Sequence, residues 1–155
     1  ARIDGAALPA PADVAAIDAA QARLGVALPD DLAALYRAHD GVPMFDFVPL
    51  AAVVRRRETV PAMQATIEVR LLDADGGFVE PPHVVSGERA AEWLVLTTLD
   101  EGGFFHAYDI GEPPAVPGHR FVQVFSGFAV AHPSLRAWLE EQWISRQQYA
   151  AIAEQ

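Results

Sequence analysis

The stretch that most constrains the fold is a helix–link–helix segment over residues 21–41, QARLGVALPDDLAALYRAHDG. One helix ends at Gly25, and Pro29 suits the first position of the next helix. Its fixed φ is already helical, and its missing N–H would have no partner there. Two aspartates follow, where the positive end of the helix dipole favours carboxylates. Gly41 tolerates positive φ and is expected to end the second helix.

The second helix of this segment carries one apolar stripe. Leu32, Leu35, Tyr36 and His39 recur at i, i+3, i+4 and i+7, a spacing that places them on one helical face. We expect that face to be buried. His39 lies at its boundary and is expected to be a hydrogen-bonded residue rather than a general base.

The remaining patterns predict an α+β domain, with N-terminal helices, a mainly antiparallel sheet in the middle and a C-terminal helix. Asp13 is expected near the start of the first helix. Residues 50–57 are interpreted as a short helix that ends in three arginines. The expected strands are 66–72, a short edge strand from 78, 93–98, 104–110 and 120–125.

Turns and the C-terminal region complete the expected domain. Residues 73–77 and 100–103 are expected to turn the chain between strands. In the strand 104–110 the even-numbered side chains face one way and the odd-numbered ones the other. A helix begins after Pro133, and the pair Ser145 and Gln148 indicates the capping box of a separate last helix.

Length and composition indicate one domain over residues 1–155, of which 1–11 form a loose lead-in. A hydrophobic content of 52% argues against disorder. No apolar run approaches the roughly 20 residues that a membrane span needs, and the N-terminus lacks a basic-then-apolar leader pattern. The chain has no cysteine, in keeping with a reducing compartment. We therefore expect a cytoplasmic protein.

Charge is the most informative part of the composition. The net charge is −10, which argues against binding to nucleic acid or to an anionic membrane, because both require a basic surface. Residues 73–112 hold nine carboxylates against Arg89 alone, which is −8 of that total. Acid concentrated in one quarter of the chain favours a basic partner.

Motifs for catalysis, metals and cofactors are not found in the sequence. The segment Asp73-Ala74-Asp75-Gly76 resembles the start of a calcium-binding loop, but the residues after it do not match the later positions of that loop. His106, His119 and His132 are spaced by thirteen residues, which matches no zinc motif. We expect no cofactor, no metal and no catalytic residue. An enzyme that uses His106 and Asp109 in a cleft remains an alternative.

The residues of the helix–link–helix segment resemble the opening motif of the SUKH superfamily, which includes the yeast cell-wall assembly regulator and many bacterial toxin-immunity proteins. The matching positions are Leu24-Gly25, Leu28-Pro29, Leu35-Tyr36 and Gly41. Gln21, Leu32 and Asp40 stand where the family prefers Glu, an aromatic residue and Asn. Fainter similarity extends the resemblance over residues 12–142, through Trp93-Leu94-Val95-Leu96, Tyr108-Asp109-Ile110, Gly118 with Val122-Gln123-Val124, and 135–139. Residues 50–90 show no such similarity.

This resemblance implies a SUKH-like fold and a non-enzymatic, intracellular protein-binding function. Many bacterial members neutralise toxins by direct binding, and a nuclease toxin would present the basic surface that the charge pattern favours. The expected partner contacts are carboxylates of the acidic stretch, namely Glu88, Glu92, Asp100, Glu101, Asp109 and Glu112. The alternatives are a regulatory or scaffold protein with a housekeeping partner, and an acidic surface that only confers solubility.

Overall fold

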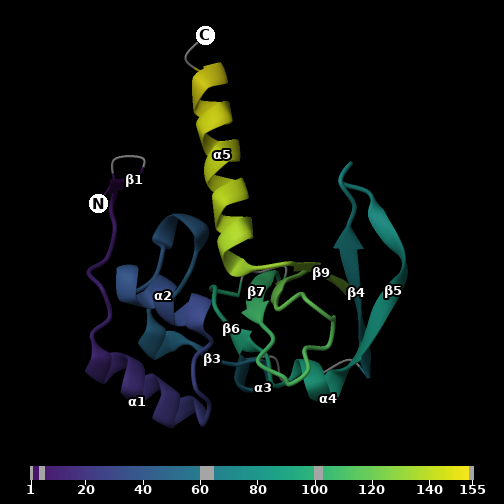
Figure 1. Ribbon diagram of the computed structural model, residues 1–155, viewed down its shortest axis with the longest axis horizontal. Coiled ribbons are helices and arrows are strands. Elements are labelled where there is room, and N and C mark those ends of the chain that lie inside the picture. Colours follow the sequence, from purple (N-terminus) through teal and green to yellow (C-terminus); the bar gives the residue numbers. More distant parts are fainter. Residues whose placement is uncertain (1, 4–5, 60–64, 100–102, 154–155) are drawn as a thin grey trace.

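The computed structural model describes residues 2–3, 6–59, 65–99 and 103–153. It is an α+β structure with N-terminal helices, a seven-stranded sheet and a long C-terminal helix (Figure 1), which confirms the expected fold class. The helices are α1 (Val14–Leu24), α2 (Asp30–Ala38), α3 (Arg56–Thr59), α4 (Gly87–Ala90), α5 (Leu135–Ala153) and the short 3-10 turns η1 (Pro43–Phe45) and η2 (Leu50–Ala52). The strands are β1 (Arg2–Ile3), β2 (Ala6–Ala7), β3 (Val54–Arg55), β4 (Thr66–Leu72), β5 (Phe78–Ser86), β6 (Leu94–Val95), β7 (Phe105–Tyr108), β8 (Phe121–Val124) and β9 (Phe128–His132).

Local signals place the first two helices as expected. Asp13 caps α1 by accepting a hydrogen bond from the N–H of Ala16 at 2.7 Å, and Gly25 ends it at φ 70°. Pro29 lies one residue earlier than expected, as the cap before α2. His39 follows α2, with its Nδ1 atom 2.9 Å from the carbonyl oxygen of Pro9, so it is hydrogen-bonded as expected.

The large sheet has the strand order β3-β6-β7-β8-β9-β4-β5. Its neighbours are antiparallel except for β4 and β9, which run parallel. The predominantly antiparallel arrangement was expected, whereas β9 was not. Its sequence, FAVAH, contains two alanines and too little alternation to indicate a strand, and it forms because it fits between β8 and β4.

The structure corrects several local expectations. Of the expected strand 93–98 only β6 (Leu94–Val95) forms, and the second helix ends at Ala38 instead of at Gly41. Residues 50–57 form a 3-10 turn, the strand β3 and the start of α3 rather than one helix. β5 is nine residues long instead of a short stub, because its two prolines lie on an edge strand where a missing N–H costs no ladder bond. α5 continues unbroken to Ala153, so there is no separate last helix. The lead-in contains the strand pair β1–β2. Most of the expected turn 100–103 lies outside the described residues.

Two hydrophobic cores lie on the two faces of the sheet. The first is formed by the helices with β6, β7 and β8, and its centre holds Tyr36, Leu94, Phe121 and Trp138. The second lies on the opposite face beneath α4 and residues 115–116, around Trp93. Tyr108 belongs to the first core, whereas Phe105 and Ala107 belong to the second, which confirms the expected alternation along β7.

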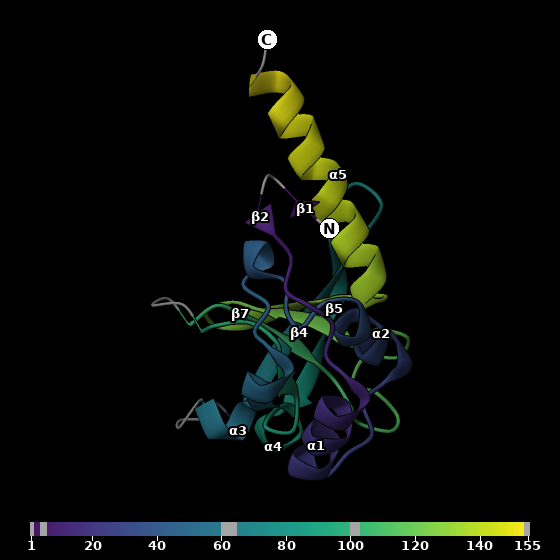
Figure 2. The same cartoon turned by 90° about the vertical axis from the view of Figure 1, so that its left-hand side faces the viewer.

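The helix α5 rises steeply from the sheet. Its first turns are buried through Leu135 and Trp138, and Arg146 holds it farther along by donating to the carbonyl oxygen of Met44 at 2.8 Å. Figures 1 and 2 show that α5 and the turn between β4 and β5 project on the same side of the sheet, whereas α1, α3 and α4 lie toward the other end. Among the described residues, no helix has the length and apolarity needed to cross a membrane.

Candidate functional site

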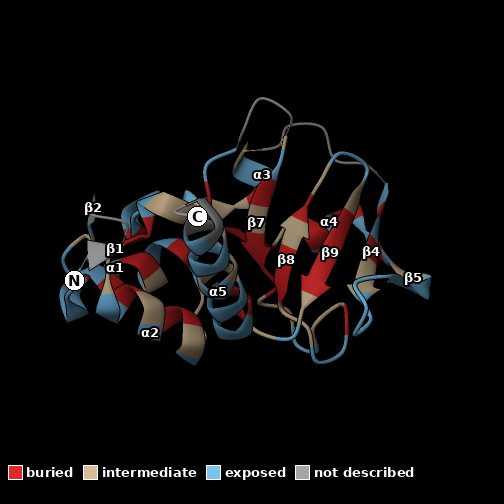
Figure 3. Ribbon diagram, turned by 90° about the horizontal axis from the view of Figure 1, so that it is seen from above, coloured by how far each residue is buried: buried red, intermediate tan, exposed pale blue. Residues whose placement is uncertain are grey.

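Part of one sheet face lies beside α5 without a helix over it (Figure 3). The helices and the base of α5 cover this face over β6, β7 and part of β8. Beyond them, the strands β9, β4 and β5 lie open next to the projecting α5. We call this region, with the adjoining ends of β7 and β8, the open face.

Four phenylalanine rings in mutual contact cross the open face. Their centroids are 6.0 Å apart for Phe78 and Phe128, 5.1 Å for Phe128 and Phe125, and 5.7 Å for Phe125 and Phe104. The two end rings are well exposed, with Phe78 at 48% and Phe104 at 42%. These spacings are typical of stabilising aromatic pairs. We call these four residues the phenylalanine strip.

A row of polar side chains runs over β9, β8 and β7 on the same face. His132 donates from Nε2 to Oε1 of Gln123 at 2.6 Å, and the amide nitrogen of Gln123 lies 3.0 Å from Nε2 of His106. An amide nitrogen only donates, so His106 Nε2 must accept and its proton lies on Nδ1. Thr97 completes the row by accepting the backbone N–H of His106 at 2.7 Å. These contacts require a neutral His106.

Burial keeps these two histidines uncharged. Desolvation is the main cause that lowers the pKa of His106 to about 4, with the positive charge of His132 as a second cause. Desolvation likewise lowers the pKa of His132 to about 4, with a smaller contribution from the charge of His119. His106 is also enclosed by the rings of Phe47, Phe121 and Trp138. Neutral histidines in this position stabilise the sheet face rather than provide a charge.

Two pockets lie at the ends of the polar row. One, of about 310 Å³, is lined by Asp46, Thr97, His106 and Gln123 together with Phe104 and Phe125 of the strip. The other, of about 480 Å³, lies between the β4–β5 turn and α5. Its polar lining comes from Asp73, Asp75, His119, His132 and Glu141.

The carboxylates expected to contact a partner lie elsewhere. Glu88 is exposed on α4, at the end of β5 opposite the β4–β5 turn. Glu92 forms ion pairs with Arg55 at 2.7 Å and Arg57 at 2.6 Å, and Glu112 pairs with Arg120 at 2.7 Å. Asp100 and Glu101 lie outside the described residues. Arginines from other parts of the chain thus offset much of the charge that the acidic stretch shows in the sequence.

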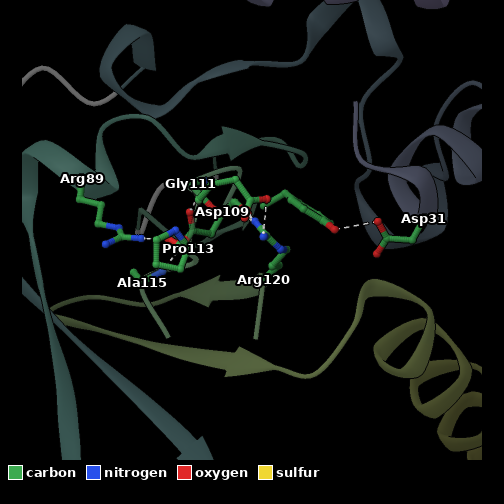
Figure 4. Close-up of polar contacts among 9 residues, drawn as sticks. Asp31, Arg89, Asp109, Gly111, Pro113, Ala115 and Arg120 are labelled. Carbon is green, nitrogen blue, oxygen red and sulfur yellow. Dashed lines mark hydrogen bonds and ion pairs between the residues drawn. The ribbon is translucent and has the colours of Figure 1, made fainter. Parts of the chain in front are cut away.

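Asp109 is buried, with only 2% of its surface exposed, so its carboxylate does not lie on a contact surface. It accepts the backbone N–H of Gly111 at 2.8 Å and that of Ala115 at 2.7 Å (Figure 4). Arg120 donates to the carbonyl oxygen of Asp109 at 3.0 Å, and Arg89 donates to that of Pro113 on the far side of the same loop. Asp109 therefore shapes the loop that follows β7.

His106 and Asp109 do not form the catalytic pair that the alternative function as an enzyme requires. Their side chains lie on opposite faces of the sheet region around β7, and each is held by other partners. Within the part of the chain that the structure describes, no group of three or more histidine, aspartate or glutamate side chains is placed to hold a metal ion.

Comparison with models of known families matches residues 11–141 to the SMI1 / KNR4 family (SUKH-1). The chain belongs to this family. Comparisons with curated proteins and with solved structures gave no match. The family match confirms the resemblance carried by residues 21–41, and it includes residues 50–90, where similarity was not recognised. SUKH-family proteins are generally non-catalytic immunity or regulatory proteins.

The residues of the open face were not recognised as a site from the sequence. From the sequence, Phe104 is expected as the first residue of the strand 104–110, and Phe78 only as the start of a short edge strand. A signal was present in the exposed aromatic residues of β5 and of the segment before β7. It could not be interpreted without β9, because Phe128 joins the two halves of the phenylalanine strip.

Proposed function

We propose that this SUKH-family protein is an immunity protein that binds and neutralises a cognate bacterial toxin. The observation that carries the proposal is the phenylalanine strip on the open face. A contiguous apolar patch with a polar border is typical of a protein–protein interface. Aromatic residues are enriched at such interfaces and often supply most of the binding energy.

The open face has the shape and composition that a protein partner needs. α5 and the β4–β5 turn stand on either side of it and would contact the flanks of a bound partner. Fully burying a phenylalanine side chain contributes about 1.5–3 kcal/mol, and nearly half of that surface is still exposed on Phe78 and Phe104. Phe78 and Phe104, at the two ends of the strip, would therefore be strong contact residues for a partner that covers both.

The carboxylates Glu88, Glu92 and Glu112 define a competing contact surface around α4. The same end of the molecule carries Arg55, Arg57, Arg89 and Arg120, so its carboxylates and guanidinium groups nearly balance. A balanced surface steers a basic partner weakly. We therefore favour the open face as the main contact region and test the α4 end in parallel.

Growth rescue tests the function and the surface together. The chain is co-expressed in a bacterial host with toxin domains encoded next to it in its own genome. We expect rescue by the wild type, and loss of rescue and of co-purification in the double variant Phe78→Ser with Phe104→Ser. The matched control is Val14→Ser, which removes a 73% exposed apolar side chain from α1.

The other outcomes assign the alternatives. Rescue that survives the phenylalanine variant but is lost in Glu88→Arg with Glu112→Arg places the contact at the α4 end. If the chain protects against none of these toxins, the immunity role is wrong and a regulatory role with a housekeeping partner is favoured. Circular dichroism melting of each purified variant shows that the loss is not caused by unfolding.

A further inference from the structure

The open face carries an excess of negative charge that the linear sequence does not reveal. Six carboxylates lie on it or line its two pockets, whereas Arg70 is the single guanidinium group that we find there among the described residues. The carboxylates are those of Asp46, Glu68, Asp73, Asp75, Glu80 and Glu141. Counted over the described residues alone, one positive and six negative charges give this face a net charge of −5.

The single cation that the described residues place on the open face is already engaged. Arg70 forms ion pairs with Glu68 and Glu80, and its guanidinium group lies over the ring of Phe78, 5.3 Å from the centroid. It therefore supports the phenylalanine strip, and its charge is already engaged by Glu68 and Glu80. In the described part of the chain, Asp75 and Glu141 take part in no ion pair.

Negative charge and apolar surface adjoin each other on this face. The pocket between the β4–β5 turn and α5 places Asp75 and Glu141 on its two sides, with the apolar side chain of Leu72 in its lining. Leu72 is 45% exposed and lies in register with Phe78 of the strip. A ligand that spans the face would thus contact aromatic rings and, next to them, carboxylates.

We infer that the open face binds a segment of a partner protein that is apolar on one side and carries arginine or lysine side chains on the other. This inference rests on the proposed protein-binding function and specifies its partner chemistry. The apolar side of the segment covers the phenylalanine strip. Its cations lie at the pocket between the β4–β5 turn and α5, where long, flexible basic side chains reach carboxylates on both sides.

Two designed peptides test the inference. Both are fluorescein-labelled 18-residue amphipathic peptides with leucine on one face, and the polar face is arginine in one and glutamate in the other. Fluorescence anisotropy is measured at about 20 mM and 300 mM salt, because screening weakens exposed charge–charge attraction. We expect the arginine peptide to bind at least tenfold more tightly than the glutamate peptide at low salt, and this preference to shrink at high salt.

Two charge-matched variants locate the binding site. Asp75→Arg with Glu141→Arg changes the open face, whereas Glu88→Arg with Glu112→Arg makes the same change in net charge at the α4 end. We expect the first variant to lose at least tenfold in affinity for the arginine peptide and the second to lose less than threefold. Equal losses in both variants, or a larger loss in the second, overturn the inference, because the attraction would then not be localised on the open face.

The phenylalanine variant separates this inference from the proposed function. One outcome would overturn the charge inference and retain the apolar contact surface. In it, the wild type binds both peptides equally well, and the double variant Phe78→Ser with Phe104→Ser binds neither. Binding that is unchanged by the phenylalanine variant overturns the open face as the contact surface. No binding of the arginine peptide to the wild type overturns the inference.

Discussion

Gln123 and His132 are joined across β8 and β9 by a 2.6 Å hydrogen bond that needs a proton on Nε2 of the histidine. The same glutamine donates to His106 on β7, so one side chain fixes which ring nitrogen of His106 accepts and which ring nitrogen of His132 donates. The row crosses three neighbouring strands beneath the base of α5.

Stability is expected to fall as the medium becomes more acidic. The folded-state pKa values of His106 and His132 are about 4, below the value of about 6.5 for an unfolded chain. Between pH 6.5 and 4 the unfolded state binds more protons than the folded state, so the free energy of unfolding decreases as pH falls through this range. Below pH 4 these two histidines are protonated in both states and contribute little further change. Urea unfolding of wild type, His132→Gln and the control His83→Gln checks this. A pH slope as steep in His132→Gln as in wild type contradicts it.

Gln123→Glu is expected to raise the pKa of both histidines. A carboxylate in this position accepts hydrogen bonds from His132 and from a protonated His106, and it stabilises their positive charge. NMR titration of the histidine ring protons measures the change. Gln123→Leu is the comparison, because it removes the hydrogen bonds without adding charge. Histidine pKa values that stay near 4 in Gln123→Glu would show that burial alone determines them.

Asp109→Ala is expected to destabilise the protein by about 3 kcal/mol. The change leaves the backbone N–H groups of Gly111 and Ala115 without their acceptor in a buried loop, and hydrogen bonds to a buried charged group contribute about 1.5–3 kcal/mol each. The control in the same loop is Glu112→Ala, which breaks a surface ion pair and should cost less than about 1 kcal/mol. Chemical denaturation measures both. Similar losses in the two variants would contradict the structural role of Asp109.

Gly41→Ala is expected to cost more than Gly25→Ala, although both glycines have positive φ. An added Cβ at Gly41, at φ +100°, would lie 2.8 Å from the carbonyl oxygen of Phe47, whereas at Gly25 it would meet no atom within 4 Å. The conformational cost for alanine at Gly25 is about 1–2 kcal/mol. The steric clash adds to it at Gly41, where we expect a total above about 3 kcal/mol. Equal thermal shifts for the two variants would contradict this close approach.

Short-range patterns predicted much of the fold. Asp13 and Gly25 define where α1 begins and ends, and the Pro29-Asp30-Asp31 run defines where α2 begins, because capping depends on neighbours within a turn. β4 was predicted with its observed bounds, since alternation with a period of two reports directly on a half-buried strand. The failures included β9, the full length of β5, the helix expected over residues 50–57 and the continuity of α5, in all of which tertiary contacts outweigh local preference.

The candidate site could not be predicted in the same way. The acid-rich stretch 73–112 suggested one charged surface, yet β5 separates Asp73 and Asp75 from Glu88. Arg55 and Arg120, which both lie outside that stretch, pair with Glu92 and Glu112. A charge count along the chain sums carboxylates that lie far apart in the folded protein. It also leaves out arginines from other segments that lie next to those carboxylates.

The sequence by itself determined the family, the α+β class and the helix–link–helix segment, because those depend on residue types at short, regular spacing. Only the tertiary structure decided which arginine meets which carboxylate, and that β9 lies parallel to β4. It also decided that Phe78, Phe128, Phe125 and Phe104 form one strip on a sheet face without a helix. The physical reason is that these relations join residues from different elements, and their distances depend on how the strands pair rather than on the local preference of any one segment.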